Sequence, residues 1–139
     1  MSLETTLVLL KPDALEKRIV GQVVARFESA GLRIRGMKMF RFEDTLLREH
    51  YAHIAAKPFF PEVQEFMQKT PVIALALEGP GSVNRVRELL GPTDSKKAAK
   101  GTIRGDFGLD VMVNVAHASD SAETAAVELK RFFQPNELF

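Results

Sequence analysis

The chain has 139 residues, of which 45% are hydrophobic and 27% charged, and its formal net charge is +1. This composition is typical of a globular protein, and it carries no overall charge that would attract a polyanion. The absence of cysteine excludes disulfides and thiolate metal sites. The length fits one core, so we expect a single domain over residues 1–139.

The chain carries no signal that would direct it to a membrane or out of the cell. No apolar run approaches the ~20 residues that a membrane-spanning helix needs. The first residues lack the basic and apolar regions of a signal peptide. We therefore expect a cytoplasmic protein without a membrane partner.

The first half of the chain alternates strand-like and helix-like patterns. Residues 6–10 are a continuous apolar run, which predicts a buried strand. Residues 20–30 place apolar side chains at helical spacing, which predicts a helix. Residues 32–42 alternate apolar and basic side chains with one slip, which predicts a half-exposed strand with a bulge at Gly36. Two predicted helices follow, over residues 45–56 and 59–67.

The second half repeats this alternation around a long polar segment. Residues 72–77 predict a buried strand and residues 83–90 a short helix. Residues 91–105 contain few apolar side chains and predict a long loop, a feature that is usually functional or mobile. The last predicted elements are a strand over residues 111–116 and a helix over residues 121–133. Asp120 and Glu123 resemble a capping box for that helix.

This order of elements predicts the fold class. Strands separated by crossing helices indicate an α+β protein with the ferredoxin-like βαββαβ plan. We expect an antiparallel sheet covered by helices, with extra helices and a long loop before the last strand.

One histidine is placed where a nucleophile would meet an anion. His117 follows the last predicted strand, and Ser119, Asp120 and Ser121 after it can cap a helix, whose N-terminus attracts anions. A neutral imidazole can act as a nucleophile near pH 7. Glu128 on the following helix is a candidate partner for the second ring nitrogen, with Ser119 as a bridge. A purely structural histidine stays an alternative from these residues alone.

The other chemical signals are weaker. His50 and His53 lie three residues apart on a predicted helix, and we interpret them as solvated surface, because Zn²⁺ needs three or four defined ligands. The chain has neither a P-loop nor a hydrolase nucleophile elbow. Lys11, Arg87 and Arg104 lie near predicted strand ends and loops, where they could bind phosphate oxygens. Taken singly, each is also typical of a solvated surface charge.

Several segments together resemble the nucleoside diphosphate kinase family over nearly the whole chain. They are Leu10-Lys11-Pro12-Asp13-Ala14, Val20-Gly21-Gln22-Val23, His50-Tyr51, Lys57-Pro58-Phe59-Phe60, Arg87 with Leu90-Gly91, Gly101-Thr102-Ile103-Arg104-Gly105-Asp106-Phe107 and Asn114-Val115-Ala116-His117-Ala118-Ser119-Asp120-Ser121. The first and the last two are highly specific in combination, and their order and spacing also match.

The resemblance implies an activity. The γ-phosphate of a nucleoside triphosphate, usually ATP, would pass to a nucleoside diphosphate by a ping-pong route through a phosphohistidine on His117. Mg²⁺ would be carried on the nucleotide phosphates, with no direct protein ligand for the metal. The family also implies a homo-oligomer, either a tetramer or a hexamer.

The resemblance further implies roles for individual residues. Glu128 and Ser119 would orient His117. The side chains around the phosphates and the sugar would be Lys11, Tyr51, Arg87, Arg104 and Asn114, with Thr93 touching a phosphate. Phe59 would stack on the base and Val63 would line its other side, and such apolar contacts tolerate every base.

The sequence departs from the family pattern in the long loop. Asp94-Ser95 stands where Asn-Pro is frequent, and Lys100 replaces a usual proline. Because proline restricts the unfolded chain, its absence predicts an unusually mobile loop over residues 91–100.

Two other functions stay open at this point. One is a catalytically silent nucleotide-binding regulator on the same fold, although the chain keeps the residues that catalysis needs. The other is a nucleic-acid-binding ferredoxin-like module. The net charge and the apolar strands argue against nucleic acid as a specific partner, and only one basic stripe favours it: Arg33, Arg35, Lys38 and Arg41.

Overall fold

The computed structural model describes residues 2–139 and confirms the predicted α+β fold. Its elements in chain order are β1 (Leu3–Leu10), α1 (Pro12–Glu16), α2 (Val20–Ser29), β2 (Arg33–Phe40), α3 (Asp44–His50), α4 (Phe60–Gln68), β3 (Val72–Pro80), α5 (Ser82–Leu90), α6 (Ile103–Phe107), β4 (Ala116–Ala118) and α7 (Ala122–Phe132). The four strands form one antiparallel sheet in the order β2-β3-β1-β4. Among residues 2–139, no helix has the length and apolar character needed to cross a membrane.

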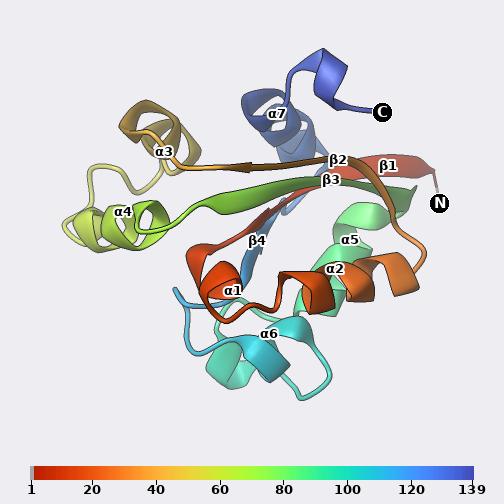
Figure 1. Cartoon of the computed structure of the whole chain (residues 1–139), viewed down its shortest axis with the longest axis horizontal. Helices are drawn as coiled ribbons and strands as arrows, with labels where there is room; N and C mark the ends of the chain where they lie inside the picture. Colours follow the sequence, from red (N-terminus) through yellow and green to blue (C-terminus); the bar gives the residue numbers. More distant parts are fainter. Residues whose placement is uncertain (1) are drawn as a thin grey trace.

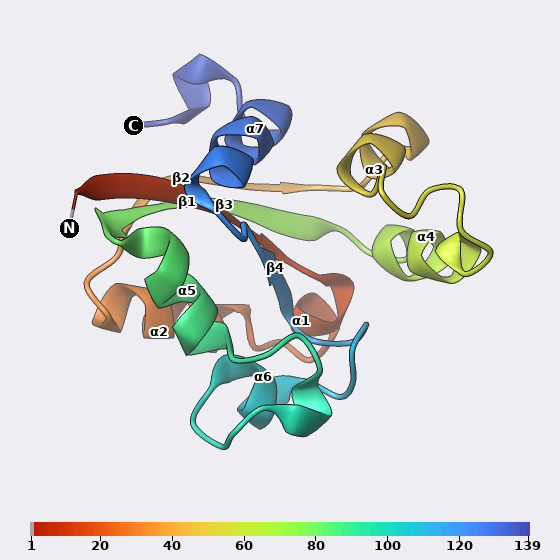
Figure 2. The ribbon, with the colours of Figure 1, turned by 180° about the vertical axis from the view of Figure 1, so that it is seen from behind.

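The sheet is covered on both faces, because its central strands are apolar on both sides. In β1, Val8 and Leu10 belong to the core that packs against α2 and α5, whereas Leu7 and Leu9 belong to a second core beneath α7 and α4. Figures 1 and 2 show α2, α5 and α6 on one side of the sheet and α7 on the other. This alternation is the pattern expected of a strand buried on both faces.

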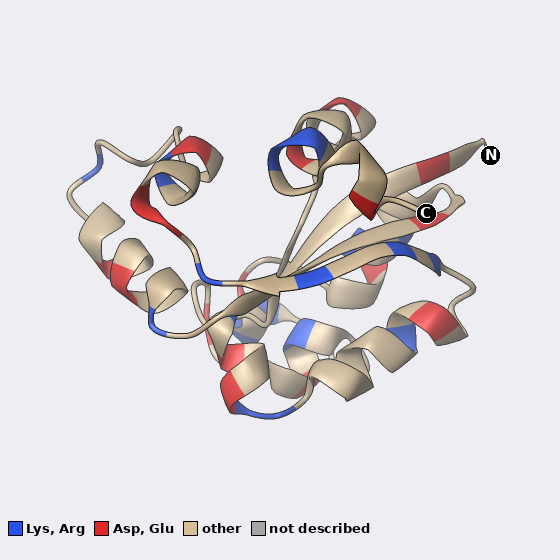
Figure 3. Cartoon of the chain, turned by 45° about the horizontal axis from the view of Figure 1, so that its top comes forward, with Lys and Arg blue, Asp and Glu red and all other residues tan. Residues whose placement is uncertain are grey.

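Strand β2 is an edge strand and carries the predicted bulge. Its register with β3 shifts between Ile34 and Gly36. A Cβ atom at Gly36 would lie 3.0 Å from the Glu137 carbonyl oxygen, so a larger residue would displace the C-terminal segment. Figure 3 shows several Lys and Arg positions along the ribbon of this strand.

The basic side chains of β2 are engaged within the chain. Arg33 pairs with Glu78 at 3.1 Å, and Lys38 pairs with Glu137 at 3.0 Å. Most of the stripe therefore has acidic partners within the chain, since Arg35 also lies 3.8 Å from Glu78, and this weakens the case for a nucleic-acid surface.

The long loop before the last strand is confirmed, although it ends earlier than predicted, whereas the predicted position of the last strand was wrong. The loop predicted over residues 91–105 ends at Thr102, whose hydroxyl accepts a hydrogen bond from the Gly105 N–H and caps α6. The predicted strand over residues 111–116 is largely irregular, and β4 begins only at Ala116. The Asp110 carboxylate accepts hydrogen bonds from the N–H groups of Met112 and Val113, and such local bonds compete with a strand ladder.

Two helix boundaries also differ from prediction. The helix predicted over residues 45–56 ends at His50, and successive turns follow it. At α7, Ser121 is the capping residue, because its hydroxyl accepts a hydrogen bond from the Thr124 N–H at 3.1 Å. The capping box expected from Asp120 and Glu123 is therefore wrong by one position.

The loop over residues 91–100 makes defined contacts. The Ser95 N–H donates to the Asp110 carbonyl at 3.2 Å, and the Asp94 carboxylate accepts from the Lys96 N–H at 3.1 Å. Its mobility stays a prediction that these contacts do not favour.

Candidate active site

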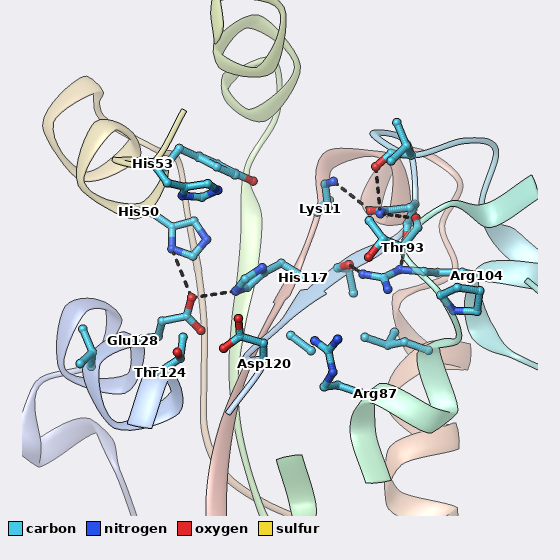
Figure 4. Close-up of a pocket in the computed structure, with 18 of the residues that line it drawn as sticks. Lys11, His50, His53, Arg87, Thr93, Arg104, His117, Asp120, Thr124 and Glu128 are labelled. Atoms are coloured by element: carbon cyan, nitrogen blue, oxygen red, sulfur yellow. Dashed lines mark hydrogen bonds and ion pairs between the residues drawn. The ribbon is translucent and has the colours of Figure 1, made fainter. Parts of the chain in front are cut away.

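A large cleft opens where β1 ends and β4 begins, beside α7 and α5. Its volume is about 1230 Å³. Eight of the site residues predicted from sequence line it: Lys11, Tyr51, Arg87, Thr93, Arg104, Asn114, His117 and Glu128. Ser119 is fully buried behind Glu128, whereas Phe59 and Val63 do not line the cleft. Figure 4 shows His117 between the cations and the acidic side chain of Glu128.

His117 is held by α7 through one ring nitrogen. It lies within β4, opposite Leu9 of β1, rather than just past a strand as the sequence predicted. Its Nε2 lies 2.9 Å from Oε2 of Glu128, and the Ser119 hydroxyl donates to Oε1 of the same carboxylate at 2.6 Å. A carboxylate accepts hydrogen bonds, so the imidazole carries its proton on Nε2. Nδ1 is therefore the ring nitrogen with a free lone pair.

Glu128 stays ionised despite its burial. Burial alone would raise the pKa of this carboxyl group, but the hydrogen bonds from His117 and Ser119 oppose that effect, and the net result is a lowered pKa. A charged acceptor strengthens the hydrogen bond that orients the imidazole.

On the opposite side of the cleft, Lys11 is a buried amine. Its Nζ donates to the Met112 carbonyl at 2.6 Å and to Oδ1 of Asn114 at 2.9 Å. Burial, assisted by the charge of Arg104, lowers the pKa of Lys11 to about 8, although Asp13 opposes this shift. A bound anion would favour the protonated amine.

Arg104 joins three parts of the backbone around the cleft. Its guanidinium donates to three carbonyl groups, those of Asn114 at 3.2 Å, Gly91 at 3.0 Å and Ala116 at 2.5 Å. Burial and the nearby charge of Arg87 lower the pKa of Arg104 to about 10, so the group remains cationic at neutral pH.

The backbone turns sharply between Asn114 and His117. Val115 has a φ of 77°, a left-handed conformation that β-branched residues rarely adopt. The Lys11 N–H donates to the Val115 carbonyl at 2.8 Å, and Oδ2 of Asp13 accepts from the Val115 N–H at 2.9 Å. Asp13 thus stabilises this turn, a role that the sequence analysis did not find.

His50 is not the solvated residue that the sequence predicted. Its side chain is only 2% exposed, and its ring centroid lies 4.7 Å from that of His117, nearly perpendicular to it. Burial and the neighbouring His117 lower the pKa of His50 to about 3, so it is neutral. The burial of His50 could have been predicted from the sequence, because His50 lies three residues after Leu47 and so shares the buried face of α3. His53 remains exposed.

One group of side chains in residues 2–139 has the composition of a metal site. Potential ligand atoms of His50, His117 and Glu128 all lie within 4.8 Å of one another. However, the Arg131 guanidinium lies 3.0 Å from Nδ1 of His50, and its positive charge would oppose a cation there. We interpret the group as a hydrogen-bonded cluster.

A histidine with a free nitrogen, facing buried cations, has the arrangement that phosphoryl transfer needs, because charge neutralisation and positioning do most of the chemical work in that reaction. The family model described as nucleoside diphosphate kinase matches residues 4–138. A protein from Parabacteroides distasonis named nucleoside diphosphate kinase is 49% identical over 137 residues, which cover 99% of this chain and 90% of that protein.

Solved structures agree with this match. The nucleoside diphosphate kinase of Aquifex aeolicus superposes with a TM-score of 0.94 and 43% identity, covering 99% of this chain and 100% of the other. The Halobacterium salinarum enzyme, solved in complex with CDP, gives a TM-score of 0.95 and 39% identity over 99% and 92% of the two chains. The chain belongs to the nucleoside diphosphate kinase family, whose members transfer phosphate between nucleotides.

Proposed function

We propose that His117 carries the phosphate between two nucleotides by a ping-pong route. Nδ1 attacks the γ-phosphorus of a nucleoside triphosphate, the bond to the β,γ-bridging oxygen breaks, and a nucleoside diphosphate leaves. The phosphohistidine then donates the same phosphoryl group to the terminal oxygen of a second nucleoside diphosphate. The observation that carries this proposal is the 2.9 Å contact of Nε2 with Glu128, because it leaves Nδ1 unprotonated.

Glu128 and Ser119 have the orienting role in this route. The carboxylate keeps the proton on Nε2 and stabilises the positive charge that the ring acquires as Nδ1 attacks. The Ser119 hydroxyl donates a hydrogen bond to the other carboxylate oxygen, Oε1 of Glu128, at 2.6 Å and so fixes the orientation of the carboxylate.

The cations on the other side neutralise the phosphates. Lys11, Arg87 and Arg104 line the same cleft as His117 and supply charge where negative charge develops during transfer. Asn114, Tyr51 and Thr93 contact the sugar and phosphates. The substrate is the Mg²⁺ complex of the nucleotide, in which the metal is held by phosphate oxygens, the hard ligands that it prefers.

Phe59 and Val63 form the base slot in this proposal. Phe59 is 50% exposed, so its ring is available for stacking at the entrance to α4. Stacking and apolar contact do not distinguish the hydrogen-bonding edges of bases, which supports broad nucleotide specificity.

The chain forms a homo-oligomer, a tetramer or a hexamer, in this proposal. Edge strand β2 has one neighbour in the sheet, and it carries two exposed methionines, Met37 at 51% and Met39 at 61%. Light scattering of the purified protein would measure the assembly. A cytoplasmic location and a single cooperative domain over residues 1–139 also stay predictions, which cell fractionation and a single unfolding transition would test.

The test is labelling with γ-³²P-ATP. The chain should acquire an acid-labile phosphate that ADP or GDP removes, and ³¹P NMR should place it on Nδ1. His117→Ala should abolish labelling, whereas His53→Ala, which removes an exposed histidine beside the cleft, should leave it intact. Nucleotide binding without label would instead support the silent regulator, an alternative that the family match does not favour.

A further inference from the structure

Arg131 lines the same cleft on the side of α7, where its guanidinium contacts His50 and Glu49, two residues to which we assign no contact with the nucleotide. It follows Glu128 by three residues on α7, so both side chains emerge from the same face of the helix. Its NH1 lies 3.0 Å from Nδ1 of His50, and its Nε lies 3.7 Å from the carboxylate of Glu49. The side chain is 16% exposed, so the contact with His50 is largely screened from water.

The contact fixes where the proton of His50 resides. An arginine guanidinium has only donors and does not deprotonate in proteins, so Nδ1 of His50 must accept the hydrogen bond. His50 is neutral, as its burial requires. Its single ring proton is therefore on Nε2.

This tautomer is unfavourable on its own. Nε2 of His50 is buried and has no hydrogen-bond partner among residues 2–139. A buried donor without a partner is costly. The other tautomer would have a partner, because Nδ1 lies 3.8 Å from Oε2 of Glu128, and a small rotation of the ring would bring the two within hydrogen-bond distance.

That oxygen is the one that holds His117. Oε2 of Glu128 accepts from Nε2 of His117 at 2.9 Å, as Figure 4 shows, with His50 directed at the same carboxylate from α3. If His50 carried its proton on Nδ1, two imidazoles would compete for one carboxylate oxygen, and the bond that orients His117 would weaken.

We propose that Arg131 holds His50 in its Nε2-protonated tautomer, so that Oε2 of Glu128 accepts a hydrogen bond from His117 alone. Arg131 is thus a positioning residue that acts through His50 and keeps Nδ1 of His117 available for phosphorylation. This inference rests on the proposed role of His117 as phosphate carrier.

Histidine-selective ¹⁵N NMR tests the tautomer directly. In the wild-type protein and in Arg131→Lys, whose ammonium is also a pure donor, Nδ1 of His50 should be the unprotonated nitrogen. In Arg131→Leu the proton should move to Nδ1. Lys130→Leu is the matched control, because it removes an exposed charge from the neighbouring position of α7 and should give the wild-type spectrum.

Single-turnover phosphorylation by ATP tests the consequence. Arg131→Leu should lower the rate at saturating ATP by ~10-fold, the size of effect that a partner behind a reactive histidine has, with the ATP dissociation constant unchanged. Arg131→Lys and Lys130→Leu should stay within about twofold of wild type. Adding His50→Phe to Arg131→Leu removes the competing donor and should restore most of the rate.

A His50 proton that stays on Nε2 in Arg131→Leu would overturn the inference, and so would a double variant as slow as the single one. Failure of the wild-type protein to accept label would contradict the role of His117 instead, while the tautomer spectrum would still report on Arg131.

Discussion

His117 lies between two regions that are stabilised in different ways. On the side of Lys11 and Arg104, buried cations donate to backbone carbonyls and to an amide, so their charges also hold the chain segments together. On the side of Glu128, a single carboxylate accepts hydrogen bonds from His117 and Ser119.

The difference separates two tasks of the site. The cationic side shapes the backbone, so that a change there should affect folding and phosphate binding together. The acidic side sets the proton position of one ring, so that a change there should affect the rate while leaving the fold intact. The predictions below test whether this division holds.

Arg104→Ala should have the largest effect because it damages both tasks of the cationic side. Three carbonyl groups around the cleft lose their donor, which should lower the free energy of unfolding by about 3 kcal/mol. Phosphorylation should slow by ~1000-fold. Denaturant titration and single-turnover labelling measure the two effects. Arg41→Ala is the control, because this exposed guanidinium donates to one carbonyl, that of Gln68. If Arg104→Ala slowed phosphorylation but kept wild-type stability, the proposed division between the two sides of the site would be wrong.

Glu128→Gln should slow phosphorylation by ~100-fold, since the amide cannot hold the imidazole proton as a carboxylate does. Its stability at pH 7 should change less than that of Arg104→Ala. The pH dependence gives a second readout. The pKa of Glu128 is lowered from 4.5, so its ionised form contributes stability above pH 4.5 that is lost as pH falls through the folded-state pKa. The unfolding midpoint of Glu128→Gln should therefore decrease less than that of the wild-type protein as the pH is lowered.

The affinity for ADP should decrease by ~10-fold as pH rises above 8, because Lys11 loses the proton that pairs with phosphate. The pKa of Lys11 is about 8 in the free protein, and a bound anion raises it, so the loss should begin near pH 8 and continue above it. Calorimetric titration measures the affinity. Lys11→Arg stays charged and should flatten the profile. A wild-type profile that is equally flat would show that the amine keeps its proton despite its burial.

Patterns of hydrophobicity predicted the fold well because burial determines it. The apolar run of β1 identified a strand covered on both faces, and its two core clusters confirm this. The bulge at Gly36 was likewise visible as a slip in the alternation. By contrast, residues 111–115 are apolar except for Asn114 and still form no strand, because the Asp110 carboxylate and the turn at Val115 determine their path.

The candidate site was predictable where segments of the sequence resemble specific family motifs. Lys11, Arg104 and His117 lie in such motifs, and the structure brings all three to one cleft. The supporting residues were missed because their roles depend on tertiary contacts. Asp13 matters through the N–H of Val115, and Arg131 matters through a histidine 81 positions away in the chain.

Ser121→Ala should have the smallest effect and tests how rigidly α7 presents Glu128. Loss of the hydroxyl that accepts from the Thr124 N–H should cost about 1 kcal/mol of unfolding free energy. The phosphorylation rate should stay within about twofold, because the helix is also anchored by buried Ala125 and Phe132. Glu123→Ala is the matched control and should leave stability unchanged, since Ser121 is the capping residue. If the phosphorylation rate of Ser121→Ala fell as far as that of Glu128→Gln, the N-terminus of α7 would itself position the carboxylate of Glu128. The acidic side of the site would then depend on the order of the backbone as much as the cationic side does.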